Sequence, residues 1–192
     1  MAAAQTWPRQ FVARRAFFNF LGVRFRIYVG GHLAFFVKQK AFRLKEDITI
    51  FSDETQTQPM LQIRARNIID FAAIYDVIDP HTGQAVGAIQ RKGIRSMLRD
   101  EWHVLDPSGG ILAQIQEESL GLALLRRVLF SLIPQTFLVS SGSVTLGHMK
   151  QRFNPFIHVY DVDLQATENH ELNPRLGIAA AVLLLAIERR QK

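Results

Sequence analysis

The C-terminal part of the chain contains one long apolar run. It extends over 12 residues, from Leu176 to Ile187, without a polar side chain. A helix that is apolar on every side must be buried either in lipid or in protein. Because spanning a bilayer takes about 20 apolar residues, a run of this length indicates a helix inside the protein.

The residues on both sides of the run support a helix over residues 174–190. Asn173 is a suitable N-cap, and Pro174 fits the first helical turn. Arg189, Arg190 and Lys192 suit the negative end of the helix dipole.

Strands are predicted over most of the remaining chain. From Phe11 to Asp163 the dominant hydrophobic period is two, which is typical of strands with one buried face. In one example, Phe25 and Ile27 alternate with Arg24 and Arg26. The pattern predicts about twelve strands, near residues 11–17, 22–29, 32–40, 46–52, 61–66, 71–79, 85–92, 98–105, 111–118, 136–141, 144–151 and 156–163.

An internal repeat predicts how some of these strands pair. The segments 75–80 and 102–107 both end in Asp-Pro and lie 27 residues apart, and a glycine follows each of them. Asp, Pro and Gly in this order favour a tight turn, so each copy predicts a β-hairpin. A weaker copy over residues 50–63 suggests three successive hairpins.

Together these elements predict the architecture. The side chains of an eight-stranded barrel about fill its interior. A larger barrel leaves space inside that a ligand, water or another part of the chain must fill. We therefore expect a mainly β (α+β) fold: one domain over residues 1–192, a closed antiparallel barrel of about 12 strands enclosing the hydrophobic C-terminal helix. An additional amphipathic helix is predicted over residues 120–133. It either closes one end of the core or lies at a membrane interface.

Charge is distributed unevenly along the chain. The formal net charge is +6, and residues 9–45 contain nine Lys or Arg and no acid. This basic N-terminal region predicts an anionic partner, either phospholipid or nucleic acid, or else a solvated face without a partner. The chain has no cysteine, which excludes disulfides and thiolate catalysis. We expect a cytoplasmic protein, although the Arg-rich, acid-free N-terminus also resembles a transit peptide.

The order of about twelve antiparallel strands and a hydrophobic C-terminal helix resembles the tubby C-terminal-like superfamily, which includes the phospholipid scramblases and the LURP-one-related proteins. The chain is most similar to the LURP-one-related and scramblase-like branch. The resemblance extends from about Phe11 to Arg190. It is based on Asp79-Pro80, Asp106-Pro107, Leu132-Ile133-Pro134-Gln135 and Ile178-Ala179-Ala180-Ala181.

The resemblance implies binding of phosphoinositide headgroups through paired basic residues on strands, as in tubby domains. Scramblases have an acidic calcium-associated segment before the last strand, but the comparable segment here, 150–155, is basic. This difference argues against calcium control. Three pairs have the spacing that places two cations on one strand face: Arg24 with Arg26, Lys38 with Lys40, and Arg64 with Arg66. These six residues are the candidate lipid-headgroup site.

No enzymatic motif is present in the sequence. The six histidines lack metal-ligand spacing, and we expect neither catalytic residues, nor a metal, nor a cofactor. Asp161 and Asp163 share a strand face but are too few for a calcium site.

The resulting hypothesis is a non-enzymatic barrel that binds anionic phospholipid headgroups, peripheral to the membrane and without a transmembrane span. The alternative is a structural or protein-interaction scaffold of the LURP-one-related type with no lipid ligand. Nucleic-acid binding is disfavoured because no recognition helix or base-stacking motif accompanies the basic region.

Overall fold

The computed structural model of the chain describes residues 6–16, 23–39, 48–69, 72–92, 101–118, 134–154, 157–165 and 172–187. Within these ranges it contains twelve strands and one helix. The strands are β1 (Gln10–Ala16), β2 (Val23–Val29), β3 (His32–Gln39), β4 (Ile48–Phe51), β5 (Pro59–Ile69), β6 (Ala72–Ile78), β7 (Ala85–Arg91), β8 (Glu101–Leu105), β9 (Ile111–Glu117), β10 (Thr136–Ser141), β11 (Val144–Arg152) and β12 (His158–Leu164). The helix is α2 (Pro174–Ile187).

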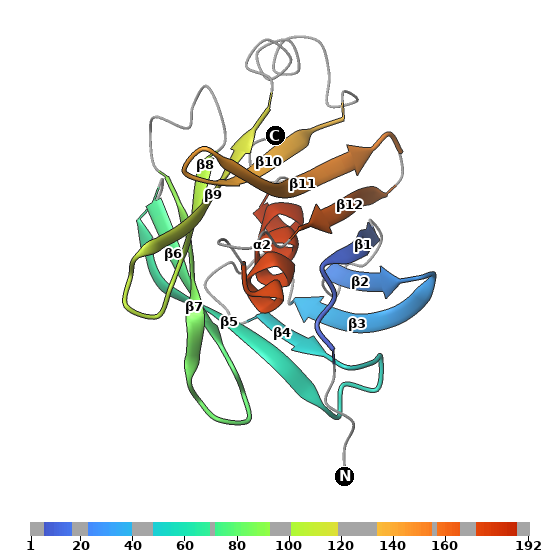
Figure 1. Cartoon of the computed structure of the whole chain (residues 1–192). Coiled ribbons are helices and arrows are strands. Elements are labelled where there is room, and N and C mark those ends of the chain that lie inside the picture. Colours follow the sequence, from blue (N-terminus) through green and yellow to red (C-terminus); the bar gives the residue numbers. More distant parts are fainter. Residues whose placement is uncertain are drawn as a thin grey trace.

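The strands form one closed barrel in which each strand pairs antiparallel with its neighbours in the sequence (Figure 1). Closure is completed by β1, which pairs with both β2 and β12. All twelve predicted strands are found, with ends that differ by a few residues, and the predicted closed antiparallel barrel is confirmed. The amphipathic helix predicted over residues 120–133 lies outside the described residues.

Alternation along the strands separates an apolar inner face from a polar outer face. On β2, Phe25 and Ile27 are buried, whereas Arg24 is exposed and Arg26 is half-buried. Gly87 on β7 allows the wall to pack closely. Its φ is 153°, and a Cβ atom there would lie 2.3 Å from the carbonyl oxygen of Leu105 on β8.

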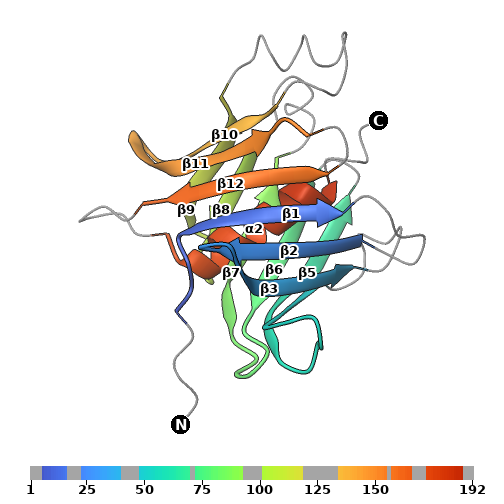
Figure 2. The same ribbon diagram turned by 90° about the vertical axis from the view of Figure 1, so that its right-hand side faces the viewer.

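The side chains of α2 are buried over three turns. Every residue from Leu176 to Ala186 is buried, and all except Gly177 belong to the same hydrophobic cluster as the inward-facing strand residues. Figures 1 and 2 both place α2 among the strands. Burial on all sides is what the uniformly apolar sequence of this helix requires.

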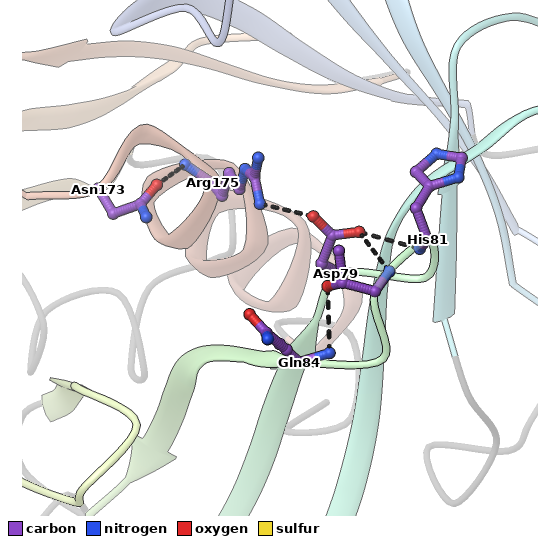
Figure 3. A network of polar contacts seen from close by, with 6 residues as sticks. Asp79, His81, Gln84, Asn173 and Arg175 are labelled. Carbon is purple, nitrogen blue, oxygen red and sulfur yellow. Dashed lines mark hydrogen bonds and ion pairs between the residues drawn. The ribbon is translucent and has the colours of Figure 1, made fainter.

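The start of α2 is fixed by side-chain contacts. The Oδ1 atom of Asn173 accepts a hydrogen bond from the backbone N–H of Arg175 at 3.0 Å, so the predicted N-cap is confirmed. Nη1 of Arg175 lies 2.9 Å from Oδ2 of Asp79 in the turn between β6 and β7 (Figure 3). Arg175 also lies over the ring of Trp7, and Trp7 stacks on Phe35.

The end of α2 is contacted by a strand residue. Arg15 on β1 points inward, is buried, and donates from Nη1 to the backbone oxygen of Leu185. Arg189, Arg190 and Lys192, which the sequence predicts at the negative end of the helix dipole, lie outside the described residues. We call the end of the barrel at which α2 finishes the exit end.

The three predicted hairpins are confirmed, and their turns lie at the end opposite the exit end. They connect β4 to β5, β6 to β7 and β8 to β9. In each turn an aspartate accepts a hydrogen bond from a backbone N–H two residues further on, with distances of 2.7 Å for Asp53, 2.9 Å for Asp79 and 2.7 Å for Asp106. Only Asp79 among these three contacts α2.

Asp79 also has a lowered pKa. Partial burial of its carboxylate raises the pKa, but the backbone hydrogen bonds from His81 and Thr82 and the nearby Arg175 outweigh this effect. The charged form is therefore favoured in the folded protein.

Replacing Leu183 with alanine is expected to lower the free energy of unfolding by about 2 to 5 kcal/mol, because it removes buried atoms and leaves a cavity in the core. Urea unfolding measures this change. Ile111→Ala, at a position that is 56% exposed, is the matched control and should remain within about 0.5 kcal/mol of wild type. Equal effects of the two variants would contradict the burial of α2.

Asp79→Asn is expected to reduce the free energy of unfolding at pH 7 by about 1 kcal/mol, because it removes the ion pair with Arg175. A folded-state pKa below the unfolded value stabilises the fold above the unfolded pKa, and this contribution is lost as the pH falls through the folded pKa. The difference between wild type and variant should therefore shrink below about pH 4. Urea unfolding at several pH values checks this, and a constant difference across the acid range would refute it.

Candidate functional site

The described candidate cations of β2 and β3 lie together on the outer face of the wall. Arg24 on β2 is directly opposite Lys38 on β3. Arg26, two residues along β2, is directly opposite Arg14 on β1. Arg14 was not among the candidate residues predicted from the sequence, although it lies in the same basic region. Its place beside Arg26 depends on the pairing of β1 with β2, which the spacing within one strand does not reveal.

The cations of the Arg14 and Arg26 row have compensating contacts. The Nε atom of Arg26 lies 2.5 Å from Oε1 of Glu54 in the β4–β5 turn, and its guanidinium lies over the ring of Phe36. The guanidinium of Arg14 lies 4.7 Å from the ring centre of Tyr28. Contacts of this kind stabilise exposed cations by about 0.5 to 1 kcal/mol.

Arg24 and Lys38 differ from that row. Both side chains are exposed. Within the described ranges, neither has an ion pair or a side-chain hydrogen bond, so two positive charges lie opposite each other without a nearby acid. Like charges at directly opposite strand positions are destabilising. Stabilisation of the fold therefore does not explain why these two cations lie opposite each other. The pair is the best candidate for contact with an external anion.

The candidate pair on β5 lies elsewhere on the wall. Strand β4 separates β5 from β3, so Arg64 is at least about 10 Å from Lys38. Arg64 donates to Oε1 of Gln62 at 3.0 Å. Arg66 is paired with Asp76 on β6, with both Nε distances at 3.1 Å, and this contact raises the pKa of Arg66.

The six candidates are therefore only partly brought together. Arg24, Arg26 and Lys38 form one cluster, which we call the basic wall and which also includes Arg14. Arg64 and Arg66 lie outside this cluster, and the charge of Arg66 is compensated by Asp76. Lys40 lies outside the described residues.

Buried charged side chains occur inside the barrel. Arg15 and Glu117 are both buried at inward-facing positions near the exit end. Neither residue was predicted from the sequence as a buried charge. The alternation of β1 could have revealed Arg15, because Arg15 follows the buried residues Phe11 and Ala13 at intervals of two and therefore lies on the inward face.

The described residues contain no group of three or more His, Cys, Asp or Glu side chains placed to hold a metal ion. Asp161 is paired with Arg152, and Oδ1 of Asp163 accepts a hydrogen bond from Gln10 at 3.1 Å. In the part of the chain that the structure describes, α2 is too short to cross a bilayer and no other helix meets the length and hydropathy that crossing requires.

The fold defines the class of protein. It is a closed twelve-stranded antiparallel barrel with a buried C-terminal helix and a basic outer wall. The family model for LURP-one-related proteins matches residues 33–183, which is most of the chain. The chain belongs to the LURP-one-related family. This agrees with the resemblance to the tubby C-terminal-like superfamily.

One solved structure is similar over the whole chain. It is the X-ray structure of a protein from Arabidopsis thaliana, with 15% sequence identity, a TM-score of 0.51, and 99% of each chain covered. At this identity the similarity supports the fold alone. No curated protein matches the chain in sequence.

Arg24→Glu is expected to raise the free energy of unfolding by about 0.2 to 1 kcal/mol, because it replaces two opposed cations with an opposite-charge pair. The gain should decrease at high salt. Urea unfolding at low and high ionic strength measures it. In the control, Arg66→Glu removes the contact with Asp76 and should lower stability. A loss of stability in Arg24→Glu at low salt would disprove the unfavourable opposition of Arg24 and Lys38.

Proposed function

We propose that this protein is a non-enzymatic module that binds anionic phospholipid headgroups at a membrane surface through its basic wall. The observation that carries the proposal is the opposition of Arg24 and Lys38 on the outer face, exposed and without a described acidic partner. A phosphate group placed between the two cations would relieve their repulsion and accept hydrogen bonds from both.

The energetics fit a reversible attachment. Each Lys or Arg near an anionic membrane contributes about 1 kcal/mol, and the effect is screened by salt. In this proposal Arg24 and Lys38 contact phosphate directly, and Arg14 and Arg26 add to the positive potential. Lys40 extends the same set by its spacing from Lys38, and Arg64 gives a secondary contact on β5.

A fixed wall favours this role. The proposal treats the barrel as enclosing α2 as a plug, so that the packed core holds the strands and keeps the opposed cations in register. It also places the protein in the cytoplasm, peripheral to the membrane, since anionic lipids are concentrated on the cytoplasmic leaflet.

A protein-interaction scaffold is the competing function from the sequence. An acidic protein partner would meet the same cations, so the experiment must separate lipid from protein. Pure vesicles and purified protein do so, because no second protein is present.

Lys38→Glu is expected to weaken binding to vesicles that contain phosphatidylserine by about tenfold or more, because it removes one cation and places a carboxylate opposite Arg24. Flotation with vesicles of phosphatidylcholine, with and without phosphatidylserine, measures the bound fraction. Wild type should float with the anionic vesicles at low salt and be released at high salt.

The double variant Gln84→Glu, Ser143→Glu is the matched control for this measurement. Gln84 and Ser143 are exposed and lie in the β6–β7 and β10–β11 turns, so the same change of two charges falls at the end opposite the exit end. This variant should retain binding close to that of wild type. Equal recovery of wild type on neutral and anionic vesicles would remove the lipid proposal and leave the protein scaffold as the better account. Equal weakening by the two variants would mean that only net charge matters, which would also remove the basic wall as the site.

A further inference from the structure

One exposed aromatic side chain has no role in the packing described above. Phe153 directly follows Arg152, the last residue of β11, and is 63% exposed. It is the only aromatic residue among the exposed large hydrophobic residues of the described chain, and the others are Val29 and Ile111. Those two lie at the opposite end of the barrel, beside the β2–β3 turn and the β8–β9 turn.

Contacts on both sides of Phe153 hold it in place. The guanidinium of Arg152 binds both carboxylate oxygens of Asp161, at 2.7 and 2.6 Å. The Oδ1 atom of Asn154 accepts a hydrogen bond from the backbone N–H of Ile157 at 3.0 Å. The exposed ring is therefore presented by anchored neighbours.

The register places Phe153 at the same end of the barrel as the basic wall. Arg152 is opposite Val159, Val159 is opposite Arg14, and Arg14 is opposite Arg26, so these four residues form one row across β11, β12, β1 and β2. Figure 2 shows these strands side by side, together with β3. Phe153 lies one residue beyond this row.

Arg24 and Lys38 lie two residues beyond the same row in the same direction, toward the exit end. Phe153 and the opposed cations are therefore offset by one residue along the strands, about 3.3 Å. Because barrel strands are tilted by about 35–45° to the barrel axis, the row itself also shifts along the axis, by about 3 Å per strand. Over the steps from β11 to β2 and β3 this tilt adds on the order of 10 Å. All three side chains lie near the exit-end tips of β11, β2 and β3, which belong to one side of the barrel (Figure 2), so a surface that approaches this side obliquely from the exit end can contact them.

Arg152 next to Phe153 has its charge compensated by Asp161. The contribution of Phe153 and Arg152 to membrane binding is therefore apolar, whereas that of Arg24 and Lys38 is electrostatic. Exposed aromatic and cationic side chains on one side of a molecule form the combination by which peripheral proteins attach to anionic membranes.

We propose that Phe153 inserts at the headgroup level of the same anionic membrane that Arg24 and Lys38 contact, so that the barrel meets the membrane with its exit end. This inference rests on the proposed function, and it adds an orientation and an apolar anchor. The anchor explains an exposed phenylalanine that the fold itself does not use.

Tryptophan placed at position 153 tests the orientation. Phe153→Trp is mixed with phosphatidylcholine and phosphatidylserine vesicles that carry brominated acyl chains, and its emission should shift to shorter wavelength and be quenched. The wild-type chain gives the background, because Trp102 is buried and Trp7 is packed on Phe35 near the start of α2. Ile111→Trp is the matched control at the opposite end and should be neither shifted nor quenched.

Phe153→Ser gives a second readout. It should weaken binding to the same vesicles about tenfold, because the burial of an aromatic ring is lost. As salt is raised over the range in which wild type still binds, the roughly tenfold ratio of wild-type to Phe153→Ser affinity should stay constant, whereas the ratio for Lys38→Glu should shrink. Ile111→Ser should bind as wild type does. An unchanged urea unfolding curve establishes that Phe153→Ser is folded.

The outcomes separate this inference from the proposed function. If wild type binds anionic vesicles and Phe153→Trp behaves as Ile111→Trp does, the orientation is wrong while the lipid function stands. If wild type does not bind, both are wrong. If the emission of Phe153→Trp shifts with protein concentration in the absence of vesicles, Phe153 contacts a second copy of the chain, and the membrane anchor is overturned.

Discussion

The burial of α2 against the inward side chains of the strands is the constraint on which the rest of this structure depends. A helix that is apolar on all sides needs an apolar surface on all sides, and an antiparallel sheet supplies one only if alternate residues of every strand are apolar. The inner faces of the strands meet that demand along most of α2. Charged residues are consequently excluded from the middle of the barrel and remain on the outer wall or near its ends, as with Arg15 at the exit end.

Because the core does not constrain the charges on the outer wall, evolution can select these charges for functions other than packing. Arg66 and Arg152 are each paired with an aspartate on a neighbouring strand, which is the usual arrangement of exposed charges. Arg24 and Lys38 are not arranged in this way. A residue pair that opposes folding by a few tenths of a kcal/mol is readily tolerated by a protein with a large core, and such pairs tend to be retained where function needs them. This contrast within one wall identifies the site more sharply than net charge does.

The sequence predicted the strands, the hairpin turns and the start of α2 because each depends on local chemistry. Alternation identified the inward face of β2, and Asn173 identified the N-cap. The grouping of the cations was harder to predict, because spacing within a strand places two residues on one face without revealing which strand lies opposite. The bulge between Ile27 and Tyr28 shifts the register of β2 against β3, and no local pattern predicts it. Arg15 was missed as the partner of Leu185 because inward arginines contradict the apolar alternation on which the prediction relied.

The two ends of the barrel differ in a way that agrees with the proposed orientation. At the start of α2, short turns are closed by aspartates, and Asp79 connects one of these turns to the helix through Arg175. Hydrogen bonds lower the pKa of Asp106, so its carboxylate is charged at neutral pH, whereas the charge of Asp79 is compensated by Arg175. An anionic membrane would repel the carboxylate of Asp106. Arg24 and Lys38 lie toward the exit end without a described acidic partner, so in the proposed orientation an anionic surface would attract them before any side chain touches lipid.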